Sequence, residues 1–186
     1  MDLPERYERA SAGFAAVLCA VRPEQWTAPT PCSEWDVRAL VNHMARGNLS
    51  YVALLRGGTA AGFVRLRDED ALGNDPVVAY QESVRECAQA FRAPGALCRV
   101  LDYPLGPAPA AQLLAVRTTD SLVHTWDLAR AAGGDETLDP DLVTWAAASL
   151  ERTYANMSGL ENFFAPPKTP VGDGQERLLR RFGREP

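Results

Sequence analysis

The sequence predicts an all-α protein: a bundle of four long helices with an additional helix and a C-terminal tail. Apolar residues recur at three- and four-residue spacing over long stretches, and almost no stretch alternates between apolar and polar residues. Prolines and glycines separate the stretches, and several begin with a residue that often caps a helix. The connections are short to medium in length, which favours antiparallel packing of the long helices.

The first helix is expected to start near Pro4 and to end before Pro23. Its apolar residues recur at helical spacing: Leu3, Tyr7, Ala10, Phe14, Val17 and Val21. The second helix is expected over residues 34–56. Ser33 is the expected N-cap, Asp36 follows three residues later as in a variant capping box, and a pair of glycines follows the helix.

Residues 59–74 are expected to form a loop. Asp75 and Pro76 then supply an N-cap and a proline at the first helical position, so a third helix is expected from there to a proline–glycine pair at residues 94–95. Residues 98–103 are expected to form a short extended segment, which three further prolines separate from the next helix.

The fourth helix is expected over residues 110–132, before a pair of glycines, and the fifth over residues 139–157, after a second aspartate–proline pair. The chain beyond the fifth helix is rich in proline, glycine and charge, with a short helix expected over residues 176–181. The predicted organisation is a helical domain over residues 1–160 and a C-terminal tail, residues 161–186, packed on it.

Composition narrows the class of protein. A chain of 186 residues can bury a sizeable core, and its net charge of −5 and pI of about 5.1 argue against nucleic acid as the main partner. There is no apolar run of membrane-spanning length and no apolar signal core at the N-terminus, so a cytoplasmic protein with a small-molecule substrate is expected. Composition leaves the oligomeric state open between a monomer and a homodimer.

The four cysteines show no CxxC pairing, which argues against a structural zinc site on thiolates and against a secreted disulfide framework. Cys19, Cys87 and Cys98 are expected to be buried thiols. Cys32 lies close to the expected helix cap and is interpreted as structural.

The chain has two histidines, and their positions suggest a metal site. Asp120 and His124 are four residues apart, so on a helix they lie on one face, one turn apart. His43, from another helix, would supply a third ligand. Three protein ligands leave a coordination position open, as catalytic sites do. The same spacing also arises in surface ion pairs and in hydrogen-bonded core pairs.

The inward face of the fourth helix mixes apolar and polar residues. The expected stripe is Leu113, Val116, Asp120, Val123, His124, Asp127 and Ala131. A buried ionised carboxylate is costly unless it is paired or bound to a metal. The polar groups within this stripe therefore indicate a functional site.

Two further charged residues flank the predicted ligands. Arg117 lies one turn before Asp120 and would hold an anionic substrate or the ligand carboxylate, unless it is a solvated helix charge. Asp127 follows His124 by three residues and would orient the imidazole, unless it forms a salt bridge between helices or a cap.

Aromatic and amide residues near the histidines are candidates for the substrate pocket. Asn48 and Tyr51 lie beyond His43 on the second helix. Trp126 is a candidate for substrate stacking, although Trp35 and Trp126 both fit the commoner role of packing anchors.

Two segments resemble a known family. Residues 30–43, TPCSEWDVRALVNH, resemble the T-P-C-x-x-W-x-V-R-x-L-x-x-H segment of DinB-like proteins related to mycothiol-dependent maleylpyruvate isomerase. Residues 117–128, RTTDSLVHTWDL, resemble the R-x-x-[DE]-x-x-x-H-x-x-D-L helix of that family. The resemblance implies a DinB-like four-helix bundle and a divalent metal, usually zinc, held by His43, Asp120 and His124.

The chain departs from the isomerase in two respects. Asp120 stands where the isomerase has glutamate, and the chain has a short tail where the isomerase has a separate C-terminal domain. The resemblance therefore implies the metal site and the bundle, without the isomerase's own substrate.

The favoured function is a metal-dependent enzyme of thiol chemistry, in which the metal holds a thiol as a thiolate. The resemblance implies that this thiol is mycothiol, or another low-molecular-weight thiol, and that the enzyme is a transferase or an isomerase. Zinc is the expected metal, and nickel or iron would suit the same ligands. One alternative is a metalloenzyme without a thiol, such as a hydrolase or an iron oxygenase. The other alternative is a metal-binding module without catalytic activity.

Overall fold

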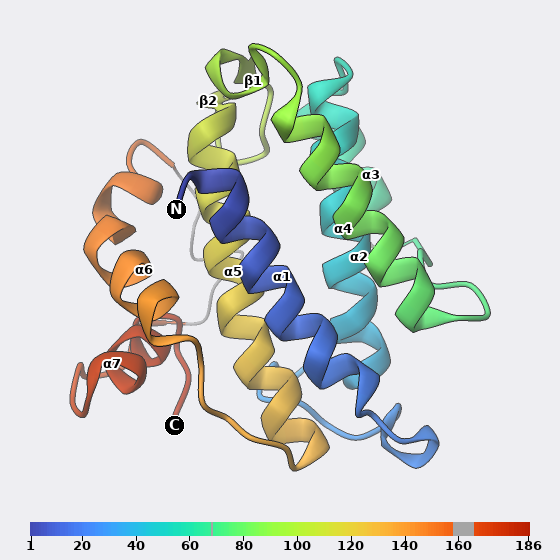
Figure 1. The fold of residues 1–186 in the computed structure, drawn as a ribbon, viewed down its shortest axis with the longest axis vertical. Coiled ribbons are helices and arrows are strands. Elements are labelled where there is room, and N and C mark those ends of the chain that lie inside the picture. The colour runs from blue at the N-terminus through green and yellow to red at the C-terminus, as the bar shows by residue number, and fades with distance from the viewer. Residues whose placement is uncertain (68, 158–165) are drawn as a thin grey trace.

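A computed structural model describes the structure of residues 1–67, 69–157 and 166–186. Four long helices form a bundle (Figure 1). They are α1 (Leu3–Cys19), α2 (Val37–Leu55), α4 (Pro76–Arg92) and α5 (Ala110–Ala132). The prediction of an all-α bundle is confirmed.

The order of the helices around the bundle brings α2 against α5. Helix α1 packs against α4 and α5, and α2 packs against the same two helices, so α1 and α2 occupy opposite corners. The buried apolar side chains of all four fill the space between them. The candidate functional site lies along the contact between α2 and α5.

Aspartate caps determine where several helices begin. The carboxylate of Asp75 accepts a hydrogen bond from the backbone N–H of Val78, at 3.1 Å, and Asp139 caps α6 (Pro140–Thr153) in the same way. Each carboxylate satisfies a backbone donor that the first helical turn leaves free, and the proline that follows has no N–H to satisfy. The starts predicted at these aspartates are confirmed.

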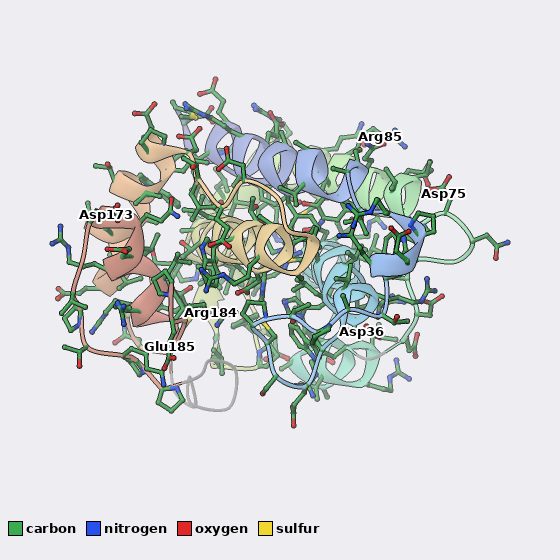
Figure 2. The ribbon with its side chains drawn as sticks, turned by 90° about the horizontal axis from the view of Figure 1, so that it is seen from below. Asp36, Asp75, Arg85, Asp173, Arg184 and Glu185 are labelled. Atoms are coloured by element: carbon green, nitrogen blue, oxygen red, sulfur yellow. The ribbon has the colours of Figure 1, made fainter. Side chains whose placement is uncertain are left out.

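The predicted start of the second helix is wrong by one turn. The cap of α2 is Asp36, labelled in Figure 2, whose carboxylate accepts the N–H of Ala39 at 2.8 Å, and Ser33 lies in the preceding turn. Residues 30–35 fold back on themselves, because the Thr30 N–H donates to the Trp35 carbonyl at 3.2 Å. The backbone N–H groups of Val37 and Arg38 donate to the carbonyls of Ala28 and Trp26, each at 3.0 Å, and connect this segment to the start of α2.

The connection between α2 and α4 is not the loop that the sequence predicts. It contains α3 (Ala60–Leu66), capped by Thr59, whose hydroxyl accepts the N–H of Gly62 at 3.1 Å. Seven residues carry too few apolar repeats for a periodicity signal.

Two short strands precede α5. The predicted extended segment contains β1 (Val100–Leu101), which pairs in antiparallel fashion with β2 (Ala108–Pro109). Two short 3₁₀ helices, η1 (Pro23–Gln25) and η2 (Ala96–Cys98), complete the connections.

Helices α6 and α7 (Gly174–Arg181) lie together beside α5, away from α2 (Figure 1). Helix α6 ends earlier than expected, at Thr153, and α7 begins two residues earlier, behind the cap Asp173. Leu178 and Leu179 of α7 pack into one cluster with α5 and α6, so the C-terminal segment contributes to the core. The predicted boundary between the helical domain and the tail, at residues 160–161, lies outside the described residues.

Cysteine burial differs from the expectation. Cys87 is buried, but Cys19 and Cys98 are exposed, because they end α1 and η2 at the protein surface. In the described part of the chain, no helix has the length and apolar character needed to cross a membrane.

Candidate metal centre

The three predicted ligands converge between α2 and α5. Nε2 of His43 lies 3.3 Å from Oδ2 of Asp120, and Nε2 of His124 lies 3.2 Å from Oδ1 of the same carboxylate. One donor atom from each residue lies within 4.8 Å of the other two. Two imidazoles and a carboxylate at this spacing are suited to bind one divalent cation.

These donors face a cavity of about 420 Å³. The side chains of His43, Asp120 and His124 are 27%, 15% and 7% exposed, so a small molecule can reach the centre from the cavity. One stripe of each helix lines it: His43, Arg46, Gly47, Ser50 and Tyr51 from α2, and Val116, Arg117, Asp120, Val123 and His124 from α5. The volume is within the range of small-molecule sites.

Asp127 sets the orientation of His124. Its Oδ2 lies 2.8 Å from Nδ1 of His124, and the Asp127 side chain is fully buried. An imidazole bound at Nδ1 by a carboxylate directs its Nε2 lone pair away from that carboxylate, here toward Asp120 and the cavity. The structure thus places Asp127 where it would orient the imidazole, as the sequence suggested.

Charge interactions in the centre shift the pKa values of its members. Burial acts to raise the pKa of Asp120, but the charge and hydrogen bonds of His124 and His43 hold it well below its usual value. Burial acts to lower the pKa of His124, yet Asp120 and Asp127 hold it well above the usual range. The raised pKa of His124 favours its protonated form, so a cation would compete with a proton for this imidazole.

His43 behaves differently from His124. Its burial outweighs the attraction of Asp120 and lowers its pKa, which favours the neutral imidazole. The neutral ring is the form that binds metals. The indole of Trp35 packs on it, with ring centroids 4.6 Å apart, and limits its contact with water.

Arg117 is a buried part of the centre. Only 2% of its side chain is exposed, and its Nη1 donates to Oδ2 of Asp120 at 2.6 Å. Nε donates to Oδ1 of Asn48 at 2.7 Å, and Nη2 donates to the carbonyl of Met44. Of the roles considered from the sequence, the structure shows the contact with the carboxylate of Asp120, a candidate ligand, and not a solvated charge.

The residues suggested for substrate binding lie in different places. Asn48 is buried beneath the cavity, where it accepts hydrogen bonds from Arg117 and from Tyr7, at 3.0 Å, and so supports Arg117. Tyr51 does line the cavity, and its hydroxyl donates to that of Tyr103 at 3.3 Å.

Trp126 does not lie with these residues. It is 1% exposed and packs in the cluster shared by α5, α6 and α7, with the guanidinium of Arg130 4.1 Å from its ring centroid. The described residues that line the cavity do not include it. This position supports packing and not substrate stacking.

Gly47 is a feature that the sequence analysis missed. A Cβ atom there would lie 2.6 Å from Nη1 of Arg117, inside contact distance. Glycine in a helix interior is unfavourable, so its presence four residues after His43 was the available signal of a packing requirement. Gly47 provides the space in which Arg117 crosses to α2.

Cys32 and Arg184 were also missed as members of the centre. Sγ of Cys32 lies 3.5 Å from Oδ2 of Asp127, and Nη2 of Arg184 lies 3.2 Å from the same sulfur. Cys32 belongs to the turn before α2 and Arg184 to the C-terminal segment. Their approach to α5 is a tertiary contact that no local pattern predicts.

A second set of potential ligands, Cys32, His124 and Asp127, shares His124 with the first. It is the poorer site, because both oxygens of Asp127 bind the guanidinium of Arg184, at 2.6 and 3.0 Å, and Asp127 is fully buried. A cation there would have to displace a buried positive charge. The set formed by His43, Asp120 and His124 faces the cavity and is favoured.

The space left by Gly47 yields a prediction with a matched control. We expect Gly47→Ala to destabilise the protein by about 1–3 kcal/mol, because the new methyl group displaces the Arg117 guanidinium from its hydrogen bonds. Gly13, within α1, is the control: its added Cβ would meet Thr125 at 3.9 Å, an ordinary contact. Gly13→Ala should stabilise the protein by up to about 1 kcal/mol through helix propensity.

Urea unfolding of both variants measures these changes. Equal effects of the two substitutions would mean that Arg117 has room to move, and that Gly47 has no special role in the centre.

Comparisons with known proteins agree with this architecture. The family model described as the mycothiol maleylpyruvate isomerase N-terminal domain matches residues 7–129, a segment that includes all three candidate ligands. Two uncharacterized proteins of Mycobacterium tuberculosis, from strains H37Rv and CDC 1551, are each 35% identical over 173 residues, covering 93% of this chain and 87% of the relative.

Solved structures resemble the fold. The crystal structure of the mycothiol-dependent maleylpyruvate isomerase matches with a TM-score of 0.61 and 16% identity, over 81% of this chain and 70% of that chain. A mutant of that enzyme, with one histidine replaced by alanine, matches with a TM-score of 0.63 over the same shares. At this identity the likeness establishes the DinB-like all-α fold.

Proposed function

Because the chain belongs to the mycothiol maleylpyruvate isomerase N-terminal domain family, we propose that it is a divalent-metal-dependent enzyme of thiol chemistry. His43, Asp120 and His124 hold the metal in this proposal. Mycothiol is the thiol, and the reaction is a transfer or an isomerisation of a small molecule. The convergence of these three donors at the wall of a 420 Å³ cavity is the observation that carries the proposal.

The donor set suits zinc. Two imidazole nitrogens and one carboxylate oxygen are zinc ligands, and nickel or iron bind the same types of donor. Three protein ligands leave room for a further ligand from the cavity. A bound zinc ion supplies a positive charge that favours the thiolate form of a thiol beside it.

The protein's own residues prepare the centre for such a ligand. Asp127 fixes the ring of His124, and Arg117 fixes Oδ2 of Asp120, so Oδ1 is left facing Nε2 of His124. The indole of Trp35 covers the ring of His43 and reduces access of water. Ligands that are held before a cation binds lose little freedom when it does.

Thiol binding is the prediction that tests this function. We expect zinc-loaded protein to bind mycothiol in isothermal titration calorimetry, and the metal-free protein to bind it far more weakly, because the thiolate needs the cation. With cobalt in place of zinc, addition of mycothiol should produce a thiolate-to-metal charge-transfer band. S-methyl mycothiol, which has no free thiol, is the control and should give no such band.

Two other results would redirect the proposal. If the metal-loaded protein binds neither mycothiol nor any small thiol, the metal centre stays but thiol chemistry is abandoned for hydrolysis or a non-catalytic role. If the protein binds no divalent metal at all, the proposed centre itself is wrong.

A further inference from the structure

The C-terminal segment reaches the metal centre from outside the bundle. After α7 ends, residues 182–186 run back along α5, and Arg184 lies next to that helix (Figure 2). Phe182, Gly183 and Arg184 line the same cavity as the candidate ligands. The segment therefore forms part of the wall around the centre.

Arg184 makes a two-point contact with Asp127. Its Nε donates to Oδ1 at 3.0 Å and its Nη2 donates to Oδ2 at 2.6 Å, while Nη1 donates to the carbonyl of Phe182 at 2.6 Å. The side chain of Arg184 is 9% exposed and that of Asp127 is fully buried. A guanidinium that binds both carboxylate oxygens fixes the plane of the carboxylate as well as its position.

This geometry bears directly on His124. Oδ2 of Asp127 is the atom that faces Nδ1 of His124, at 2.8 Å, so the plane that Arg184 imposes on the carboxylate also sets the direction of the imidazole. Sγ of Cys32 lies 3.5 Å from the same oxygen, so without Arg184 the carboxylate of Asp127 would be held only by His124 and this weak thiol contact, and its plane would no longer be fixed.

Attachment of the C-terminal segment does not by itself account for this buried pair. Arg130 donates to the carbonyl of Glu185 at 2.8 Å, and the Lys168 ammonium lies 2.9 Å from the Glu185 carboxylate. The first contact attaches the segment to α5 at the surface, and the second joins it to the chain before α7. Burying a further arginine and aspartate carries a large desolvation cost, so the pair is better explained by what it does for its neighbour.

We propose that Arg184 is a positioning residue for the metal ligand His124 and acts through Asp127. The C-terminal segment thereby completes the metal centre. This inference rests on the proposed function, because it assumes that His124 binds a metal. Residues that orient a metal ligand through one intermediate contact change metal affinity by about 10–100-fold when they are removed.

The test compares zinc affinity in three variants, by competition with a chromophoric chelator. Arg184→Ala should bind zinc about 10–100-fold more weakly than the wild type. Arg184→Lys, which keeps the charge but cannot bind both carboxylate oxygens, should recover part of the loss. Lys168→Ala, which removes a surface ion pair of the same segment, should bind zinc like the wild type.

Cobalt substitution provides a readout that simple attachment of the segment would not change. The visible d–d spectrum depends on the positions of the ligands, so Arg184→Ala should alter it and Lys168→Ala should not. If Arg184→Ala does not fold, as judged by circular dichroism, Arg184→Gln replaces it, because glutamine keeps one donor for Asp127 without the charge.

Wild-type zinc affinity and an unchanged cobalt spectrum in the folded Arg184 variants would overturn the inference and leave the metal centre intact. Failure of the wild-type protein to bind zinc would instead overturn the proposed function.

Discussion

Replacing His124 by alanine is expected to abolish zinc binding. His124 supplies one of three protein donors, and its loss leaves only His43 and Asp120 to hold the ion. The decrease in affinity should exceed the roughly 10–100-fold that is typical when a residue behind a ligand is removed. Equilibrium dialysis against zinc, followed by metal analysis of the protein, measures the loss. Catalytic turnover, measured with an identified substrate, should be lost together with the metal.

The control for folding is Thr125→Ala. Thr125 is the next residue on α5, and its hydroxyl donates to the carbonyl of Ser121 at 2.7 Å, away from the centre. Both variants should keep the helical circular dichroism spectrum, but only His124→Ala should lose zinc. Full zinc content in His124→Ala would show that the ion binds elsewhere. Loss of zinc with unchanged turnover would make the metal a bystander in catalysis.

Asp120→Ala should lose zinc as completely and should also affect stability more than His124→Ala. The carboxylate of Asp120 is the partner of the buried guanidinium of Arg117, so its removal leaves a buried charge without its counterion. A thermal melt of the two metal-free variants separates this effect from the loss of the ligand.

The fold could be predicted where the chain carries local signals. The aspartate–proline pairs at Asp75 and Asp139 mark helix starts because the cap and the proline act within one turn, and both starts are observed. The start of α2 was misplaced because Ser33 and Asp36 are both good caps. The choice between them is made by the hydrogen bond from the Val37 N–H to the Ala28 carbonyl, a contact outside the helix.

The centre could be predicted in part for the same reason. Asp120, His124 and Asp127 share one helix, so spacing alone placed them on one face. That His43 meets them depends on how α2 packs against α5, and the histidine-containing motif supplied that expectation. The approach of Arg184 and Cys32 depends on the path of the C-terminal segment and of the turn before α2, for which periodicity gives no information.

Replacing Arg117 by methionine should cost about 3–5 kcal/mol of unfolding free energy, the range typical when one member of a buried pair is removed. Methionine keeps much of the apolar stem but removes the Arg117 hydrogen bonds to Asp120, to the Met44 carbonyl and to Asn48, which keeps its hydrogen bond from Tyr7. The cost should lie near the lower limit, because Asp120 still faces His43 and His124 and is partly open to the cavity. Urea unfolding of the metal-free protein measures it.

The control for this substitution is Arg85→Met. Arg85 lies on the surface (Figure 2), with its Nη2 3.5 Å from Glu82, and exposed pairs of this kind contribute little. Zinc should restore part of the stability lost in Arg117→Met, because the cation replaces the guanidinium as the positive partner of Asp120 and binds only the folded chain. If zinc stabilises the wild type and the Arg117→Met protein equally, Arg117 serves the fold alone. A larger stabilisation of the variant would show that Arg117 and the metal act on the same carboxylate.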